Sequence, residues 1–142
     1  MSLFSILYAT NPPTAEAAIA AAFPAYIVQA RSDRSRVQTD ALNASARLRT
    51  RPNLDLELFG FEPAISIYFA IDKERATEAR QQLAAAIRSF LSSATGDVAV
   101  TYLDTLVVKR IGQTAVCAAA YSDMLPDGGA GWTTVPELVQ PE

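Results

Sequence analysis

The sequence contains no histidine, and Cys117 is its single cysteine. Without histidine, neither a Ser-His-Asp triad nor a Cys-His pair can form, and the usual zinc sites lose a main ligand. One cysteine can form no disulfide within the chain and supplies no pair of thiolates. Because Cys117 lies in an apolar run, we expect a small buried side chain there rather than an activated thiol.

Long apolar runs are missing as well. No stretch approaches the roughly 20 apolar residues that cross a bilayer. The apolar N-terminus lacks a basic region and is interrupted by Asn11-Pro12-Pro13, which predicts a strand and then a helix rather than a signal peptide. The net charge of −3 and the isoelectric point of about 4.9 argue against general binding to nucleic acid or to a membrane. We therefore expect a cytoplasmic protein.

Motifs for phosphate and acyl chemistry are also missing. Gly128-Gly129-Ala130-Gly131 has no lysine after it, and no Gly-X-Ser-X-Gly motif occurs. Carboxylate pairs such as Asp55 with Glu57 could serve acid–base or Mg²⁺ chemistry, but they are equally typical of an ordinary surface. We expect no enzyme, no metal site and no cofactor, with a carboxylate-based enzyme as the lesser alternative.

The chain does contain enough apolar residues for a core. Half of its 142 residues are hydrophobic and 19% are charged, which is typical of one folded domain. We expect a single domain over residues 1–125 and an irregular C-terminal extension over 126–142, where glycine and proline are frequent. Trp132, within that extension, is expected to fold back over the edge of the core.

Apolar periodicity predicts the elements of this domain. The alternation and the turn residues predict strands at 2–9, 44–50, 54–59, 64–71, 97–103, 105–110 and 114–121, with 25–30 as a further short candidate. Helical spacing predicts a short helix at 14–22 and a long one at 72–93 that begins at Asp72 and ends before Gly96. Residues 31–40 are expected to form a loop with a short strand near Val37.

Short connections dominate this order of elements, which favours antiparallel pairing. The predicted fold class is therefore α+β, with a mainly antiparallel sheet of about six or seven strands. One long and one short helix are expected to pack on one face of the sheet.

Basic residues are concentrated in one segment. Six of the twelve lie within 21 positions, at Arg31, Arg34, Arg36, Arg47, Arg49 and Arg51. A hairpin that turns at residues 51–53 would place Arg47 opposite Glu57 and Arg49 opposite Asp55. The cluster is thus either a solvated hairpin with local ion pairs or a site for an anion or an acidic partner.

Several motifs in the middle and at the end of the chain follow one another in a recognisable order. They are Phe59-Gly60-Phe61-Glu62-Pro63, Ile65-Ser66-Ile67-Tyr68-Phe69, Ile71-Asp72-Lys73, Gly96-Asp97-Val98-Ala99-Val100 and Leu106-Val107-Val108-Lys109-Arg110-Ile111-Gly112. Over residues 54–125 this pattern resembles the SitI-type immunity family, which is linked to swarming-inhibition toxins of myxobacteria. The resemblance implies a small antidote that binds and neutralises a cognate polymorphic toxin. It carries over no catalytic residue.

Two charged surfaces are candidates for binding such a partner. The first is acidic and would suit a basic toxin, through the residues Asp72, Glu74, Glu78 and Asp104. The plainer interpretation is that Asp72 caps a helix and that the other carboxylates solvate the surface. The second candidate is the arginine hairpin with Arg47 and Arg49.

A second function remains open beside the immunity protein. A small-molecule or anion-binding accessory or sensor module would hold its ligand near the segment 31–51. The sequence leaves open whether the chain forms a homo-oligomer.

Overall fold

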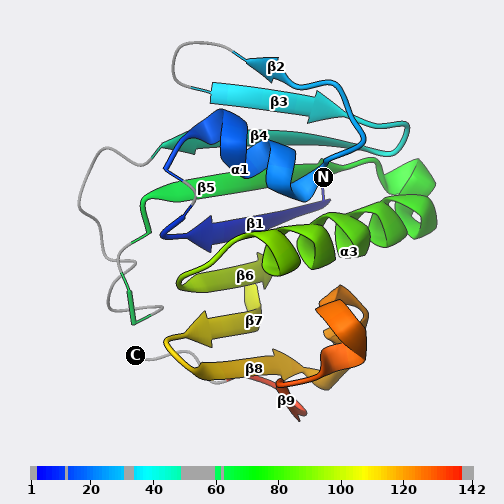
Figure 1. The fold of residues 1–142 in the computed structure, drawn as a ribbon. Helices are drawn as coiled ribbons and strands as arrows, with labels where there is room; N and C mark the ends of the chain where they lie inside the picture. Colours follow the sequence, from blue (N-terminus) through cyan, green and yellow to red (C-terminus); the bar gives the residue numbers. More distant parts are fainter. Residues whose placement is uncertain (1–2, 12, 31–33, 49–59, 62, 139–142) are drawn as a thin grey trace.

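The computed structural model describes residues 3–11, 13–30, 34–48, 60–61 and 63–138. These residues form one sheet of nine strands in the order β2-β3-β4-β5-β1-β6-β7-β8-β9 (Figure 1). The neighbours pair in antiparallel fashion except β8 and β9, which are parallel. The strands are β1 (Leu3–Ala9), β2 (Gln29–Ala30), β3 (Arg34–Gln38), β4 (Leu42–Leu48), β5 (Ile65–Ile71), β6 (Val98–Tyr102), β7 (Thr105–Ile111), β8 (Thr114–Ala118) and β9 (Thr133–Val135).

Two α-helices, α1 (Ala15–Ala22) and α3 (Ala76–Ser93), lie side by side against the same face of the sheet (Figure 1). Their apolar stripes and the inward residues of the strands form one core, centred on the fully buried side chains Leu7, Ile19, Ile67, Phe69, Leu83, Ile87 and Phe90. The predicted α+β class, the mainly antiparallel sheet and the placement of both helices on one face are confirmed.

Local capping explains where the helices begin. The Thr14 hydroxyl accepts a hydrogen bond from the Ala17 N–H, and the Asp72 carboxylate accepts one from the Glu74 N–H. Asp72 thereby caps a short 3-10 helix, η1 (Lys73–Arg75), that leads directly into α3. Gly96 has φ +95°, which confirms the left-handed residue expected beyond the long helix.

The structure corrects the expected number of strands and adds 3-10 turns. The short strand expected near Val37 is β3, which extends over residues 34–38. Val37 is its single strongly apolar residue, so its alternation gives a weak sequence signal. β2 is limited to two residues, and β8 ends at Ala118, where η2 (Ala119–Met124) begins. η3 (Pro126–Gly129) and β9 lie within the segment expected to be irregular. Trp132 packs, partly buried, against the main core as expected.

The predicted pairing of Arg47 with Glu57 is wrong. β4 has β3 along one edge and β5 along the other, and Arg47 lies opposite Arg34 and Ser66. A strand offers two edges for ladder hydrogen bonds, so no third neighbour can pair with it. The prediction joined two apolar runs that are close in sequence, whereas the sheet pairs β4 with β3 and with the later β5. The rest of the predicted hairpin, at residues 49–59, lies outside the described residues.

The described residues cover the face of the sheet opposite α1 and α3 only in part. Near β6 and β7, Phe61 is buried against Ala99 and Leu106, and Tyr8 and Leu138 pack partly buried around them. On the side of β3, β4 and β5, the outward residues are polar or aromatic and partly or largely exposed. We call the outward surface of β3, β4, β5 and β1 the open face.

The C-terminal end of α3 is held by one side chain from β7. The Arg110 guanidinium donates hydrogen bonds to the carbonyl oxygens of Leu91 at 3.1 Å, Ala94 at 2.8 Å and Gly96 at 3.1 Å. Burial lowers the pKa of Arg110, and the carboxylate of Asp97 opposes that shift. A guanidinium nevertheless stays protonated in proteins, so a cation faces the negative end of the helix dipole.

We expect Arg110→Ala to lower the free energy of unfolding by about 2 kcal/mol, because the end of the helix loses three charge-assisted hydrogen bonds. Lys109→Ala is the matched control, since the side chain of Lys109 makes no hydrogen bond or ion pair with any residue that the structure describes. Urea denaturation followed by circular dichroism measures both. Equal losses in the two variants would show that Arg110 does not anchor the helix.

Candidate partner-binding site

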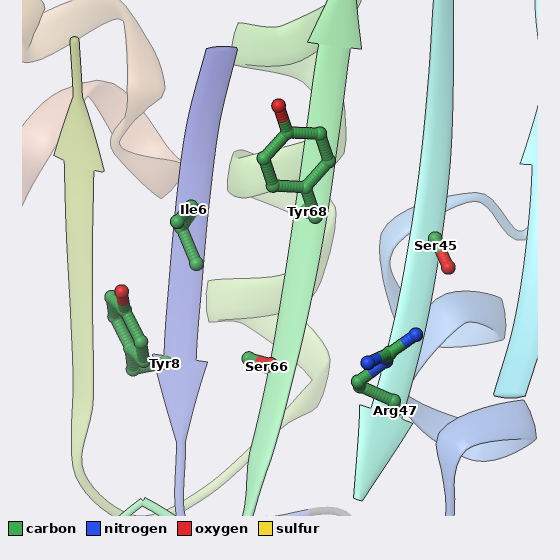
Figure 2. Close-up of a pocket in the computed structure, with 6 residues that line it drawn as sticks. All are labelled: Ile6, Tyr8, Ser45, Arg47, Ser66 and Tyr68. Carbon is green, nitrogen blue, oxygen red and sulfur yellow. The ribbon is translucent and has the colours of Figure 1, made fainter. Parts of the chain in front are cut away.

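The open face contains a hollow of about 320 Å³ whose lining comes from three adjacent strands. β4 provides Ser45 and Arg47, β5 provides Ser66 and Tyr68, and β1 provides Ile6 and Tyr8. Figure 2 shows these six side chains on one face of the three strands. They occupy alternate positions because successive residues of a strand point to opposite faces.

Strand register explains the shape of the hollow. One row across the sheet reads Arg47, Ser66 and Tyr8, and the next reads Ser45, Tyr68 and Ile6. Ser66 is the small residue between two long ones, so the surface sinks above it. Tyr8 lines the hollow on the side of β1, where it packs, partly buried, against the cluster around Phe61.

Aromatic and basic side chains surround this hollow. Tyr68 is 42% exposed, and its ring stacks on that of Phe4 with centroids 5.8 Å apart. On the side of β3, Arg34 lies opposite Arg47, and Arg36 lies opposite Ser45. The outward strand residues that the structure describes on this face include three arginines and no carboxylate. Such a surface favours anionic groups presented next to apolar ones.

Of the two predicted arginine residues, the structure places Arg47 in the hollow, and Arg49 lies outside the described residues. The sequence did not single out Ser45, Ser66 or Tyr68 as site residues. The alternation of β5 pointed Ser66 and Tyr68 outward, but only the register of three non-consecutive strands brings them beside Arg47.

The acidic residues lie at one end of the sheet. Glu74 and Glu78 line one surface hollow there, and Asp72 lines another. Asp72 follows β5, whose end pairs with Leu3, and Asp104 lies in the tight turn between β6 and β7. The adjacent Leu103 N–H donates to the Phe4 carbonyl, which places that turn at the same end, with β1 between the two carboxylates. Glu74 is exposed at the beginning of the helical segment, as Asp72 is.

Two of these four carboxylates already have structural roles. Asp72 caps η1, and Glu78 forms an ion pair with Arg75 at 2.8 Å. The structure therefore agrees with the plainer interpretation for these two residues. The carboxylates of Glu74 and Asp104 form no hydrogen bond or ion pair with the described part of the chain.

The described residues were also compared with what a metal site, a reactive thiol and a membrane span each require. No group of three or more histidine, cysteine or acidic residues is arranged there to hold a metal ion. Cys117 is buried, and burial raises the pKa of its thiol to about 11, with the carboxylate of Asp123 acting in the same direction. Among the described helices, none is long and apolar enough to span a membrane.

The fold and this surface define an α+β sheet protein with a basic, aromatic hollow on the face opposite α1 and α3. Residues 7–127 match the SitI3-like family, and the chain belongs to that family. The match includes the end of β1 from Leu7 and all of α1, so it extends further toward the N-terminus than the resemblance over residues 54–125. No curated protein and no solved structure matches the chain.

We expect Asp72→Ala to lower the free energy of unfolding by about 1 kcal/mol, because the cap of η1 is lost. Asp72→Asn should cost only a few tenths of a kcal/mol, since the amide oxygen still accepts from the Glu74 N–H. Chemical denaturation of both variants provides the comparison. A loss of equal size in the two would mean that the charge of Asp72, and not its hydrogen bond, supports the fold.

Cys117 should react very slowly in the native protein. With a pKa of about 11, roughly 0.1% of the thiol is ionised at pH 8, and burial blocks the reagent as well. Labelling with Ellman's reagent at pH 8 should proceed to one thiol per chain in guanidinium chloride and hardly at all in buffer. Rapid labelling of the folded protein would contradict the inert role.

Proposed function

We propose that this protein is an immunity protein that binds a cognate bacterial toxin in the cytoplasm and neutralises it. The observation that carries the proposal is membership of the SitI3-like family over residues 7–127. A large exposed sheet face with arginine and aromatic side chains supports it, because these residue types are enriched where proteins bind one another. The missing histidine supports action by binding rather than by turnover.

The proposal assigns binding to a single domain over residues 1–125. Residues 126–142 then form an extension, in which β9 lengthens the sheet along β8. In this arrangement the extension lies at the opposite end of the strand order from β3 and β4.

The hollow at Arg47 favours a second function, an anion-binding accessory or sensor module. A guanidinium beside two serine hydroxyls suits a small carboxylate or phosphate. The module would bind such a ligand without any toxin, which distinguishes it from the immunity protein.

The immunity function predicts rescue of growth and a fixed stoichiometry. Expression of the toxin encoded next to this gene should arrest growth, and co-expression of this protein should restore it. In vitro, toxin activity should fall in proportion to the added protein and reach zero at one equivalent, because a binding antidote is consumed.

Three results would contradict this function. The neighbouring product could be harmless, it could fail to bind in calorimetry, or a small fraction of an equivalent could silence it completely. The last result would indicate an enzyme that modifies the toxin. An unrelated protein of similar size and charge serves as the control in each assay.

A further inference from the structure

The arginines that the structure describes divide into two groups by the partners of their side chains. Arg75 binds Glu78 and the Asp40 carbonyl, and Arg110 binds three carbonyl oxygens. Arg80 and Arg88 both bind Asp123, one through its carboxylate and one through its carbonyl oxygen. By contrast, the side chains of Arg34, Arg36 and Arg47 have no hydrogen-bond or ion-pair partner among the residues that the structure describes.

The three unpartnered arginines all lie on the open face. β3 and β4 alternate so that Ser35, Val37, Ala44 and Ala46 are buried, which turns Arg34, Arg36 and Arg47 to the other side. Their charge contrasts with the net charge of −3 of the whole chain. The open face is therefore a local basic surface on an acidic protein, and it attracts groups that the rest of the protein repels.

The register makes this surface unfavourable in the isolated protein. Arg34 lies directly opposite Arg47, and like charges in directly opposed positions of antiparallel strands are destabilising. A folded chain tolerates such a conflict where function requires it. An anion placed over the two guanidinium groups would remove the repulsion.

The side chains that line the hollow suit the binding of one such anion. Arg47 can donate two parallel hydrogen bonds to a carboxylate, and the hydroxyls of Ser45 and Ser66 stand beside it. Tyr68 and Ile6 supply apolar surface to the lining of the same hollow. A carboxylate on a short apolar stem, such as an aspartate or glutamate side chain, matches both the polar and the apolar side chains of the hollow.

We infer that the open face of β3, β4, β5 and β1 binds an acidic segment of the toxin, with one carboxylate of that segment seated in the hollow at Arg47. The inference rests on the proposed function and adds the surface and the charge of the partner. An extended acidic segment covers Arg34 and Arg36 as well, whereas a small anion in the hollow leaves them bare. The acidic end around Asp72 and Asp104 is then not the docking surface.

Affinity measurements on the full chain test this inference. The toxin encoded beside the gene, in an inactivated form, is titrated with the wild type and with Arg47→Glu, Arg34→Ala and Arg36→Ala. Arg47→Glu should weaken binding by about 100-fold, since a buried charge pair becomes a repulsion. Arg34→Ala and Arg36→Ala should each weaken it about 3–10-fold, mainly through slower association with a smaller dependence on salt.

Folding is controlled by a variant and by a melting curve. Lys73→Glu makes the same charge reversal at an exposed residue beside Asp72 and should leave the affinity within about twofold. The melting temperature of Arg47→Glu should be no lower than that of the wild type, because a glutamate opposite Arg34 replaces a like-charge pair. A peptide of fifteen glutamates should compete with the toxin, and a peptide of fifteen lysines should not.

The outcomes separate this inference from the proposed function. If the wild type binds the toxin and Arg47→Glu binds equally well, the inference is overturned and the immunity function stands. If Asp104→Asn or Glu74→Gln abolishes binding instead, the acidic end is the docking surface. If inorganic phosphate stabilises the wild type while Arg47→Glu retains toxin affinity, the hollow belongs to a small anion. If the wild type does not bind the toxin at all, the proposed function falls and the inference falls with it.

Discussion

Packing of α1 and α3 against one face of the sheet is the interaction on which the remaining structure depends. Each central strand buries one set of alternate residues beneath the helices, such as Ile67 and Phe69 of β5, so the other set must point away from them. Among the described residues, α1 and α3 cover one face of the sheet, and shorter segments cover part of the other. The asymmetry of the sheet, with a covered and an open face, follows directly from this arrangement.

The register of the strands decides which side chains are neighbours on the open face. Because Ser66 aligns with Arg47 on one side and with Tyr8 on the other, a short side chain lies between two long ones and a hollow results. The charges there are unpaired among the described residues, whereas the arginines near the helices are engaged with carbonyl or carboxylate oxygens. In our proposal, the fold and partner binding therefore depend on different arginines of the same chain.

Membership of the SitI3-like family is the basis for proposing that this surface binds a toxin. A toxin antidote needs fast and specific association, and complementary charge provides both. Carboxylates at the end of the sheet could serve the same purpose, but capping by Asp72 and the ion pair of Glu78 tie two of them to the fold. We therefore place the docking surface at the arginines and keep Glu74 and Asp104 as the competing hypothesis.

The sequence by itself determined the α+β class, the first strand, the long helix and the SitI-type resemblance, since these depend on local periodicity and ordered motifs. Asp72 was recognised as a cap, but it caps the 3-10 helix η1, and the long helix α3 begins at Ala76. Arg47 was recognised as a candidate, but with Glu57 as its partner. Only the tertiary structure decided that Arg47 faces Arg34 and Ser66 and joins Tyr68 in one hollow. The physical reason is that strand pairing joins segments far apart in the chain, and local pattern carries no information about which strands become neighbours.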